Sequence, residues 1–264
     1  MTQPPIRFED GAAYERGMGV WSRLAGGTFL DWLAPPPAQC WIDIGCGSGA
    51  FSELLVQRCA PAEVQGVDPS EGQLSFARTR PAAQVAAFST GDAMALPFGD
   101  DRFDAAVMAL VIFFVPEPPR GVAEMARVVR PGGLIAAYAW DMEGGGFPFA
   151  PIQAGMRAMG IAPMLPPSAD ASRQDVLMGL WSGAGLVDVE TRTITVERSF
   201  SDFEEYWVTS TNTSGAIRPI LAAMTEAEIA RFKDTVRASM LTGPSGAVTW
   251  TARANAIKGR LPGG

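Results

Sequence analysis

Short, mostly apolar segments alternate with amphipathic segments through the first half of the chain. The strand-like segments are residues 40–44, 62–68, 84–89, 102–110 and 134–140. Short runs that lack a period of two are typical of strands buried on both faces of a parallel sheet. The segments between them, such as 50–58, 71–78 and 120–130, carry apolar residues at helical spacing. This alternation predicts an α/β fold with helices on a mainly parallel sheet.

An aromatic segment precedes the first predicted strand. Residues 10–33 carry large apolar side chains at helical spacing, interrupted by Gly26 and Gly27. We therefore expect two helices there, which either pack on the core or form a lid over a site.

The second half of the chain shows alternation and helix-capping signals. Residues 186–198 and 247–258 alternate apolar and polar side chains, which predicts two further strands. Between them, Ser201 with Glu204 and Thr225 with Glu228 match capping boxes, so helices are expected to begin at both places.

A glycine-rich turn joins the first predicted strand to the first predicted helix. It contains Gly45, Gly47 and Gly49. Glycine is required in such a turn because a Cβ atom would block both the tight backbone angles and the close approach of a ligand. Gly45, Gly47 and Ala50 also satisfy the dinucleotide fingerprint, so the turn by itself is compatible with a nicotinamide cofactor.

Acidic residues follow the next two predicted strands. Asp68 lies about 20 residues beyond the glycine turn, where a carboxylate accepts hydrogen bonds from ribose hydroxyls. Its alternative role is to cap the helix that opens at Pro69. Asp92 follows the third strand, where its carboxylate can accept a hydrogen bond from an exocyclic amine. Alternatively, it is an ordinary turn aspartate.

These segments together resemble one enzyme family. Residues 43–49 resemble motif I of the class I S-adenosylmethionine-dependent methyltransferases, and residues 91–98 and 127–133 resemble later segments of that family. The resemblance spans residues 14–140 and is strongest to the ubiquinone/menaquinone-biosynthesis-like group of small-molecule methyltransferases.

The resemblance implies a Rossmann-like, seven-stranded, mostly parallel sheet. The last strand is expected to be antiparallel, with helices on both faces and a helical cap inserted after the fifth strand. One methyltransferase domain would then occupy residues 1–264. Its lid helices would lie at about 10–33 and its cap insertions at about 141–184 and 200–240.

The resemblance also implies a binding site for S-adenosylmethionine, with S-adenosylhomocysteine as the product. The glycine turn would wrap the methionine end, Asp68 would bind the ribose, and Asp92 the adenine amino group. Arg23, in the lid, would pair with the methionine carboxylate. The residues implied in the site are Tyr14, Trp21, Arg23, Asp43, Gly45, Cys46, Gly47, Gly49, Asp68, Pro69, Asp92, Ala93, Met94, Ala109 and Leu110.

Composition excludes several other classes of protein. The 264 residues carry a formal net charge of −7 with no histidine, and no basic cluster suggests a nucleic-acid partner. We expect no signal peptide in residues 1–10, no membrane span and no metal site. Three cysteines without paired spacing suit reduced thiols in the cytoplasm. The sequence leaves both a monomer and a homodimer open.

The chemistry expected of such a site needs little from a protein base. A sulfonium-bound methyl group is already activated, so alignment with a small, partly apolar acceptor for in-line displacement is the main requirement. Asp141, Glu143, Tyr14 and Tyr206 are the available bases, and no catalytic residue is assigned. An acceptor pocket is expected from the methionines 156, 159 and 164 with Phe147, Phe149 and Trp207, or these residues simply pack in the core. An NAD-dependent oxidoreductase and a non-catalytic cofactor-binding protein remain alternatives.

Overall fold

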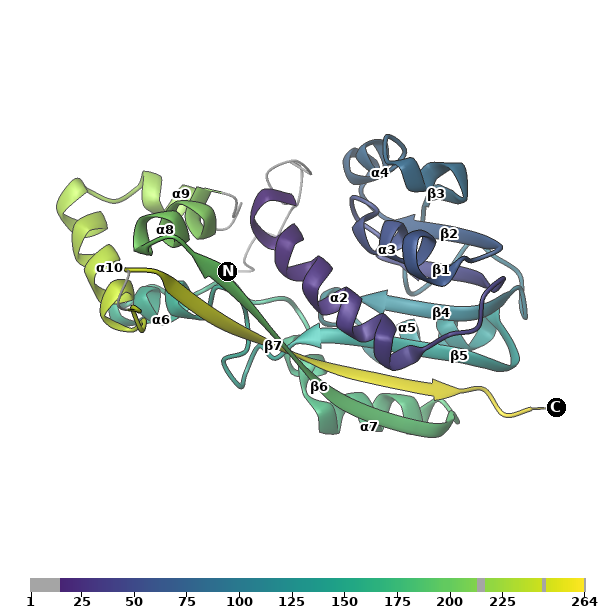
Figure 1. Cartoon of the computed structure of the whole chain (residues 1–264). Coiled ribbons are helices and arrows are strands. Elements are labelled where there is room, and N and C mark those ends of the chain that lie inside the picture. The colour runs from purple at the N-terminus through teal and green to yellow at the C-terminus, as the bar shows by residue number, and fades with distance from the viewer. Residues whose placement is uncertain (1–14, 213–216, 244–245, 264) are drawn as a thin grey trace.

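A seven-stranded sheet organises the protein (Figure 1). The computed structural model describes residues 15–212, 217–243 and 246–263. The strands are β1 (Cys40–Ile44), β2 (Glu63–Asp68), β3 (Ala86–Thr90), β4 (Phe103–Ala109), β5 (Val129–Trp140), β6 (Val187–Phe200) and β7 (Val248–Arg260). Their order is β3-β2-β1-β4-β5-β7-β6, with β1 to β5 parallel and β7 antiparallel to both β5 and β6. The predicted Rossmann-like sheet with an antiparallel last strand is therefore confirmed.

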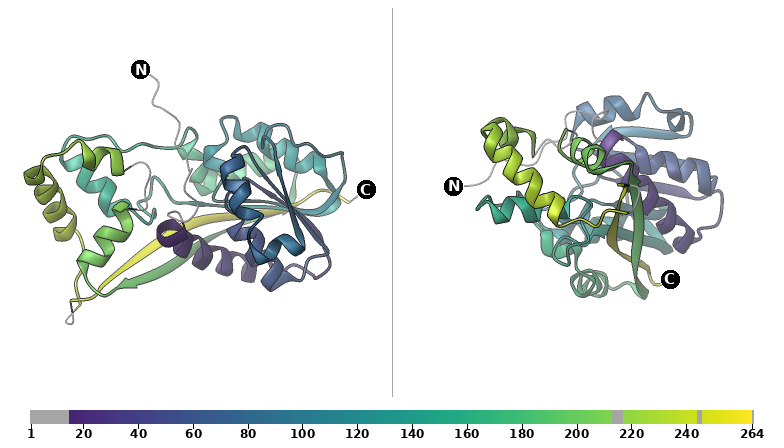
Figure 2. Two further views of the ribbon diagram at one scale, coloured as in Figure 1. Left: turned by 90° about the horizontal axis from the view of Figure 1, so that it is seen from above. Right: turned by 60° about the vertical axis from the view of Figure 1, so that its left-hand side comes forward.

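Helices cover both faces of this sheet. The α-helices are α2 (Val20–Leu33), α3 (Ala50–Cys59), α4 (Glu71–Ala77), α5 (Pro118–Val128), α6 (Ala150–Ala158), α7 (Gln174–Gly183), α8 (Phe203–Asn212), α9 (Arg218–Ala222) and α10 (Glu226–Ala238). Shorter helical turns are η1 (Glu15–Gly19), η2 (Pro81–Gln84), η3 (Ile112–Phe114) and η4 (Ala169–Ser172). Helices α2 and α3 lie on one face, and α5 and α7 on the other (Figure 2). Within the described residues, no helix combines the length and the apolar character that a membrane crossing requires.

Helix α2 runs without a break through Gly26 and Gly27, so the prediction of an interruption there is wrong. The two glycines serve a close approach of α2 to its neighbours. A Cβ atom on Gly26 would lie 3.0 Å from Leu54 Cδ1 of α3 and 3.1 Å from the Tyr138 hydroxyl of β5. On Gly27 it would lie 2.7 Å from the Arg58 guanidinium. Packing between distant segments, rather than helix termination, explains both glycines.

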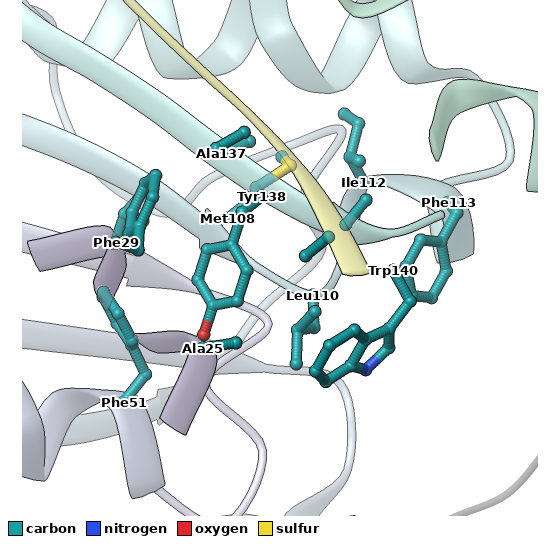
Figure 3. Packing of buried hydrophobic residues seen from close by; sticks show 14 of the residues in the cluster. Ala25, Phe29, Phe51, Met108, Leu110, Ile112, Phe113, Ala137, Tyr138 and Trp140 are labelled. Carbon is teal, nitrogen blue, oxygen red and sulfur yellow. The ribbon is translucent and has the colours of Figure 1, made fainter. Parts of the chain in front are cut away.

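Aromatic rings fix the carboxyl end of β5 against these helices. The Tyr138 ring lies 4.6 Å from that of Phe29 in α2 and 5.9 Å from that of Phe51 in α3, between ring centroids. Its hydroxyl points toward Ala25 (Figure 3). Such ring contacts add to the stability that burial already supplies. These ring contacts fix α2 and α3 against the carboxyl end of β5, next to the candidate site.

Helices α6, α8, α9 and α10 gather at one end of the molecule, beside the carboxyl end of β6 and the amino end of β7 (Figures 1 and 2).

The sequence placed helix α7 in the first cap insertion, but this helix instead packs on the sheet. There Trp181 Nε1 donates a hydrogen bond to the Ile135 carbonyl at 3.1 Å. The capping box of Thr225 and Glu228 is confirmed at the start of α10.

The predicted capping box at the start of α8 is wrong by one residue. The carboxylate of Asp202 accepts from the Glu205 amide at 2.8 Å, and the Glu205 side chain accepts from the Ser201 amide at 2.6 Å. Asp202 is an equally good capping residue, so the spacing alone could not choose between the two positions.

Candidate active site

A cavity of about 1300 Å³ opens at the carboxyl ends of β1, β2, β3 and β4. In open α/β sheets this is the edge where ligands bind. The cavity exceeds the ~300–1,000 Å³ of an ordinary small-molecule site, so it has room for two ligands side by side. Twelve of the residues implied by the family resemblance line it: Arg23, Asp43, Gly45, Cys46, Gly47, Asp68, Pro69, Asp92, Ala93, Met94, Ala109 and Leu110.

The glycine turn forms the floor of the cavity. A Cβ atom on Gly45 would lie 2.5 Å from both Cγ atoms of Val111, so this glycine allows the turn to pack against the end of β4. Gly47 has a left-handed backbone with φ of +51°, and a Cβ atom there would meet nothing within 4 Å. A side chain at residue 47 would therefore extend into open space at the cavity.

Three residues implied in the site are not among those that line the cavity. A Cβ atom on Gly49 would lie 3.0 Å from that of Ala77, so Gly49 lets α3 pack on α4. Trp21 is 1% exposed and belongs to the core. Tyr14 lies outside the described residues.

The Asp68 carboxylate joins the end of β2 to the glycine turn. Its Oδ2 accepts from the Gly47 amide at 3.0 Å and its Oδ1 accepts from the Ser70 amide at 2.8 Å. Burial raises the pKa of Asp68, and the two amides partly oppose this by stabilising the ionised form. The N-cap of the following helix is Ser70, whose hydroxyl accepts from the Gln73 amide. Asp68 is thus fixed at the cavity and is not needed as the cap.

Asp43 is fully buried beneath the same turn. Its Oδ2 accepts from the Ser52 hydroxyl at 2.6 Å, whereas Oδ1 has no hydrogen-bond partner among the described residues. Desolvation raises the pKa of Asp43 to about 7, the Ser52 hydrogen bond opposes the rise, and the nearby Asp68 charge adds to it. A buried oxygen without a partner costs free energy, which a donor on a ligand would recover.

Asp92 lies on the exposed turn after β3. Its Oδ1 accepts from the Met94 amide at 2.8 Å, which closes the turn and places Ala93 and Met94 beside the carboxylate. One carboxylate therefore lies at or just beyond the end of each of three neighbouring strands.

The described candidates for a general base lie away from the cavity. Asp141 Oδ2 lies 3.1 Å from Arg253 Nη2, and its Oδ1 accepts from the Gly144 amide at 2.9 Å. Asp141 thus holds the turn after β5 against β7. Tyr206 is buried in α8 with its ring against Phe200, and burial raises its pKa. Glu143 faces Arg173.

The apolar wall of the cavity differs from the expected one. Of the six residues expected to form it, only Met164 lines the cavity, while Met156 is buried in the core and Met159 faces a separate groove. The other apolar residues of the wall are Val111, Phe114, Val115, Pro116, Leu165 and Pro167. In the sequence, residues 111–115 continue the apolar run of β4, whereas Leu165 and Pro167 lie in the region expected to form a cap. No group of three cysteine or acidic side chains in the described part of the chain is placed to bind a metal ion.

Residues 42–137 match the family model for a methyltransferase domain. The chain is 38% identical over 132 residues to malonyl-[acyl-carrier protein] O-methyltransferase of Methylococcus capsulatus, covering 50% of this chain and 46% of that protein. It is 40% identical over 110 residues to the ubiquinone/menaquinone biosynthesis C-methyltransferase UbiE of Paracoccus denitrificans, covering 40% and 44%. Residues 42–137 therefore resemble a methyltransferase domain. The chain spans about half the length of the curated relatives it matches.

Solved structures share the methyltransferase fold. The YcgJ protein of Bacillus subtilis superposes with a TM-score of 0.58 at 17% identity, covering 90% of this chain and 99% of that one. Phosphoethanolamine N-methyltransferase 2 of Haemonchus contortus, solved with S-adenosylmethionine, superposes with a TM-score of 0.57 at 14% identity, covering 97% and 59%. The [4+2]-cyclase SpnF has a TM-score of 0.51. The shared fold therefore does not by itself specify the reaction.

Proposed function

We propose that this chain transfers a methyl group from S-adenosylmethionine to a small, partly apolar organic acceptor. The observation that carries the proposal is the cavity, which is lined by the glycine turn and by Asp43, Asp68 and Asp92. The family match and the relatives named above support the same reaction.

The chemistry of these residues fits S-adenosylmethionine. The unpartnered Oδ1 of Asp43 suits the ammonium group at the methionine end, and the open space at Gly47 leaves room for that end of the molecule. Asp68 and Asp92 suit the ribose hydroxyls and the adenine amino group, because carboxylate oxygens accept hydrogen bonds from both. Arg23 also lines the cavity and suits the methionine carboxylate.

The bound cofactor supplies a methyl group that its sulfonium charge has already activated. The chain's own contribution is to bind both molecules, to align them and to exclude water, which together lower a barrier by up to ~7–11 kcal/mol. The fixed packing of Phe29, Phe51 and Tyr138 keeps the strand ends and α2 in place for this alignment. Given the acidic chain and its free thiols, we further propose a cytoplasmic enzyme without a nucleic-acid partner.

Replacing Asp68 or Asp92 by alanine is expected to weaken S-adenosylmethionine binding by about 1–3 kcal/mol, because each change removes a charged hydrogen-bond acceptor. Calorimetric titration of each purified variant measures the loss. Asp234→Ala is the control, since Asp234 lies on α10 with 74% of its side chain exposed and should bind as the wild type does. If both variants fold and bind S-adenosylmethionine with wild-type affinity, the assignment of Asp68 and Asp92 to the binding site is wrong.

A further inference from the structure

One wall of the cavity carries no charged side chain among the described lining residues. It is formed by residues 111–116, which follow β4, and residues 164–167, which follow α6. The side chains that these segments contribute to the cavity are all aliphatic, aromatic, proline or methionine: Val111, Phe114, Val115, Pro116, Met164, Leu165 and Pro167. We call these seven residues the apolar wall.

The two halves of the apolar wall are tied together by Ser168. The Ser168 amide donates to the Phe113 carbonyl at 3.0 Å, and its hydroxyl donates to the Val115 carbonyl at 2.8 Å. Beneath the wall, Ile112 and Phe113 are buried in the core. Hydrogen bonds therefore join two segments about 50 residues apart in the chain into one continuous surface.

Charge is distributed unevenly around the cavity. The sheet order places β3, β2 and β1, with their three carboxylates, on one side of β4, whereas β5 lies on the other side and packs against η3 and η4. Among the described residues that line the cavity, no carboxylate belongs to the apolar wall, and the only cation is Arg23 of α2. If the carboxylates hold the cofactor, the apolar wall is the surface that remains for the acceptor.

This arrangement favours one kind of methyl transfer over another. An anionic acceptor and the sulfonium cation lose both charges as the methyl group moves, and a poorly solvated site favours that loss. A neutral amine instead ends with a positive charge beside the apolar wall, to which the described lining residues contribute no carboxylate. Asp141, Glu143 and Tyr206 do not line the cavity, and the three carboxylates that do are assigned to the cofactor, so we infer that the acceptor loses its proton before the reaction.

Resting on the proposed function, we propose that the acceptor is an acidic thiol, phenol or enol that reacts as its anion. Its proton passes to solvent before the transfer. The acceptor's sulfur, oxygen or carbon then forms a bond to the methyl carbon, while the bond from that carbon to the cofactor sulfur breaks and its electron pair stays on sulfur. Two neutral products result.

The test begins with titration of S-adenosylhomocysteine, because failure of that ligand to bind would overturn the proposed function rather than this inference. Methyl transfer is then measured with 4-nitrothiophenol, 4-methoxythiophenol and 4-methoxyaniline. We expect the apparent pKa in the kcat/KM profile to follow that of each thiol, and the methoxythiol to exceed the matching amine at least about tenfold. One apparent pKa shared by both thiols, an amine as fast as its thiol, or no thiol turnover by protein that binds S-adenosylhomocysteine would each overturn the inference.

A substitution that places a charge on the apolar wall provides a second test of the anionic acceptor. Leu165 is 47% exposed, so Leu165→Glu is expected to fold and to lower kcat/KM for both thiols about tenfold, with a much smaller loss for the amine, because a carboxylate there repels an anionic acceptor. Leu241→Glu is the matched control, at a side chain that is 91% exposed and outside the cavity. Equal losses for thiol and amine in Leu165→Glu, or equal effects in both variants, would contradict the proposal.

Discussion

Replacing Gly47 by leucine is expected to weaken S-adenosylhomocysteine binding at least about a hundredfold while the protein stays folded. The expectation follows from the open space beside Gly47, where a Cβ atom meets nothing within 4 Å and a longer side chain extends into the cavity. The ligand would then have to displace the leucine or bind elsewhere. Calorimetry on the purified variant measures the affinity.

Gly132→Leu is the matched control for this change. Gly132 also has a left-handed backbone, with φ of +77°, and a Cβ atom there also meets nothing within 4 Å, but it lies outside the cavity. Both variants should therefore lose a similar free energy of unfolding, about 1–2 kcal/mol for a non-glycine residue in this conformation. Only Gly47→Leu should lose binding. Wild-type affinity in Gly47→Leu, or equal losses of affinity in the two variants, would contradict this account of the turn.

The ligand-free protein is expected to lose stability as the pH rises from about 5 to 8, because of Asp43. The pKa of Asp43 is raised from 3.8 in the unfolded chain to about 7 in the fold. Between these values only the folded state holds the proton, so raising the pH favours unfolding, by roughly 4 kcal/mol over the whole range and roughly 3 kcal/mol between pH 5 and pH 8. Carboxylates with lowered pKa values, such as Glu124, act in the opposite direction and only in more acidic solution.

Denaturant unfolding of the wild type and of Asp43→Asn at pH 5 and pH 8 isolates this contribution. Asparagine has the shape of the protonated carboxyl group but does not titrate, so the variant should be the more stable protein at pH 8, and its stability should depend less on pH.

The affinity for the cofactor should change with pH in the opposite direction to the stability. A cationic ammonium favours ionised Asp43, so the affinity of the wild type should rise through pH 7, and the variant should bind more weakly at pH 8. Parallel stability profiles for the two proteins would refute the raised pKa.

The parts of the site that lie close together in the sequence were predictable from it. The glycine turn, Asp68 and Asp92 each follow a strand at a fixed local spacing, and parallel strands bring their carboxyl ends to one edge. The topology makes them neighbours without any knowledge of side-chain packing. This is why most of the residues implied by the family resemblance line the cavity.

The failures arose where the partner is distant in the chain. Gly26 indicated a helix break, but its reason is contact with Leu54 and Tyr138. Asp141 was one of four candidate bases, none of which was assigned a catalytic role, and nothing in the sequence reveals its pairing with Arg253, 112 residues later. The apolar wall was missed for the same reason, since it depends on the hydrogen bonds of Ser168 to the segment after β4.

The central claim is that the cavity at the strand ends binds S-adenosylmethionine, and parallel calorimetric titrations of the purified protein with S-adenosylhomocysteine and NADH test it most directly. The account predicts micromolar binding of S-adenosylhomocysteine and no heat of binding with NADH. Binding of NADH alone would contradict the assignment of the glycine turn and of all three carboxylates.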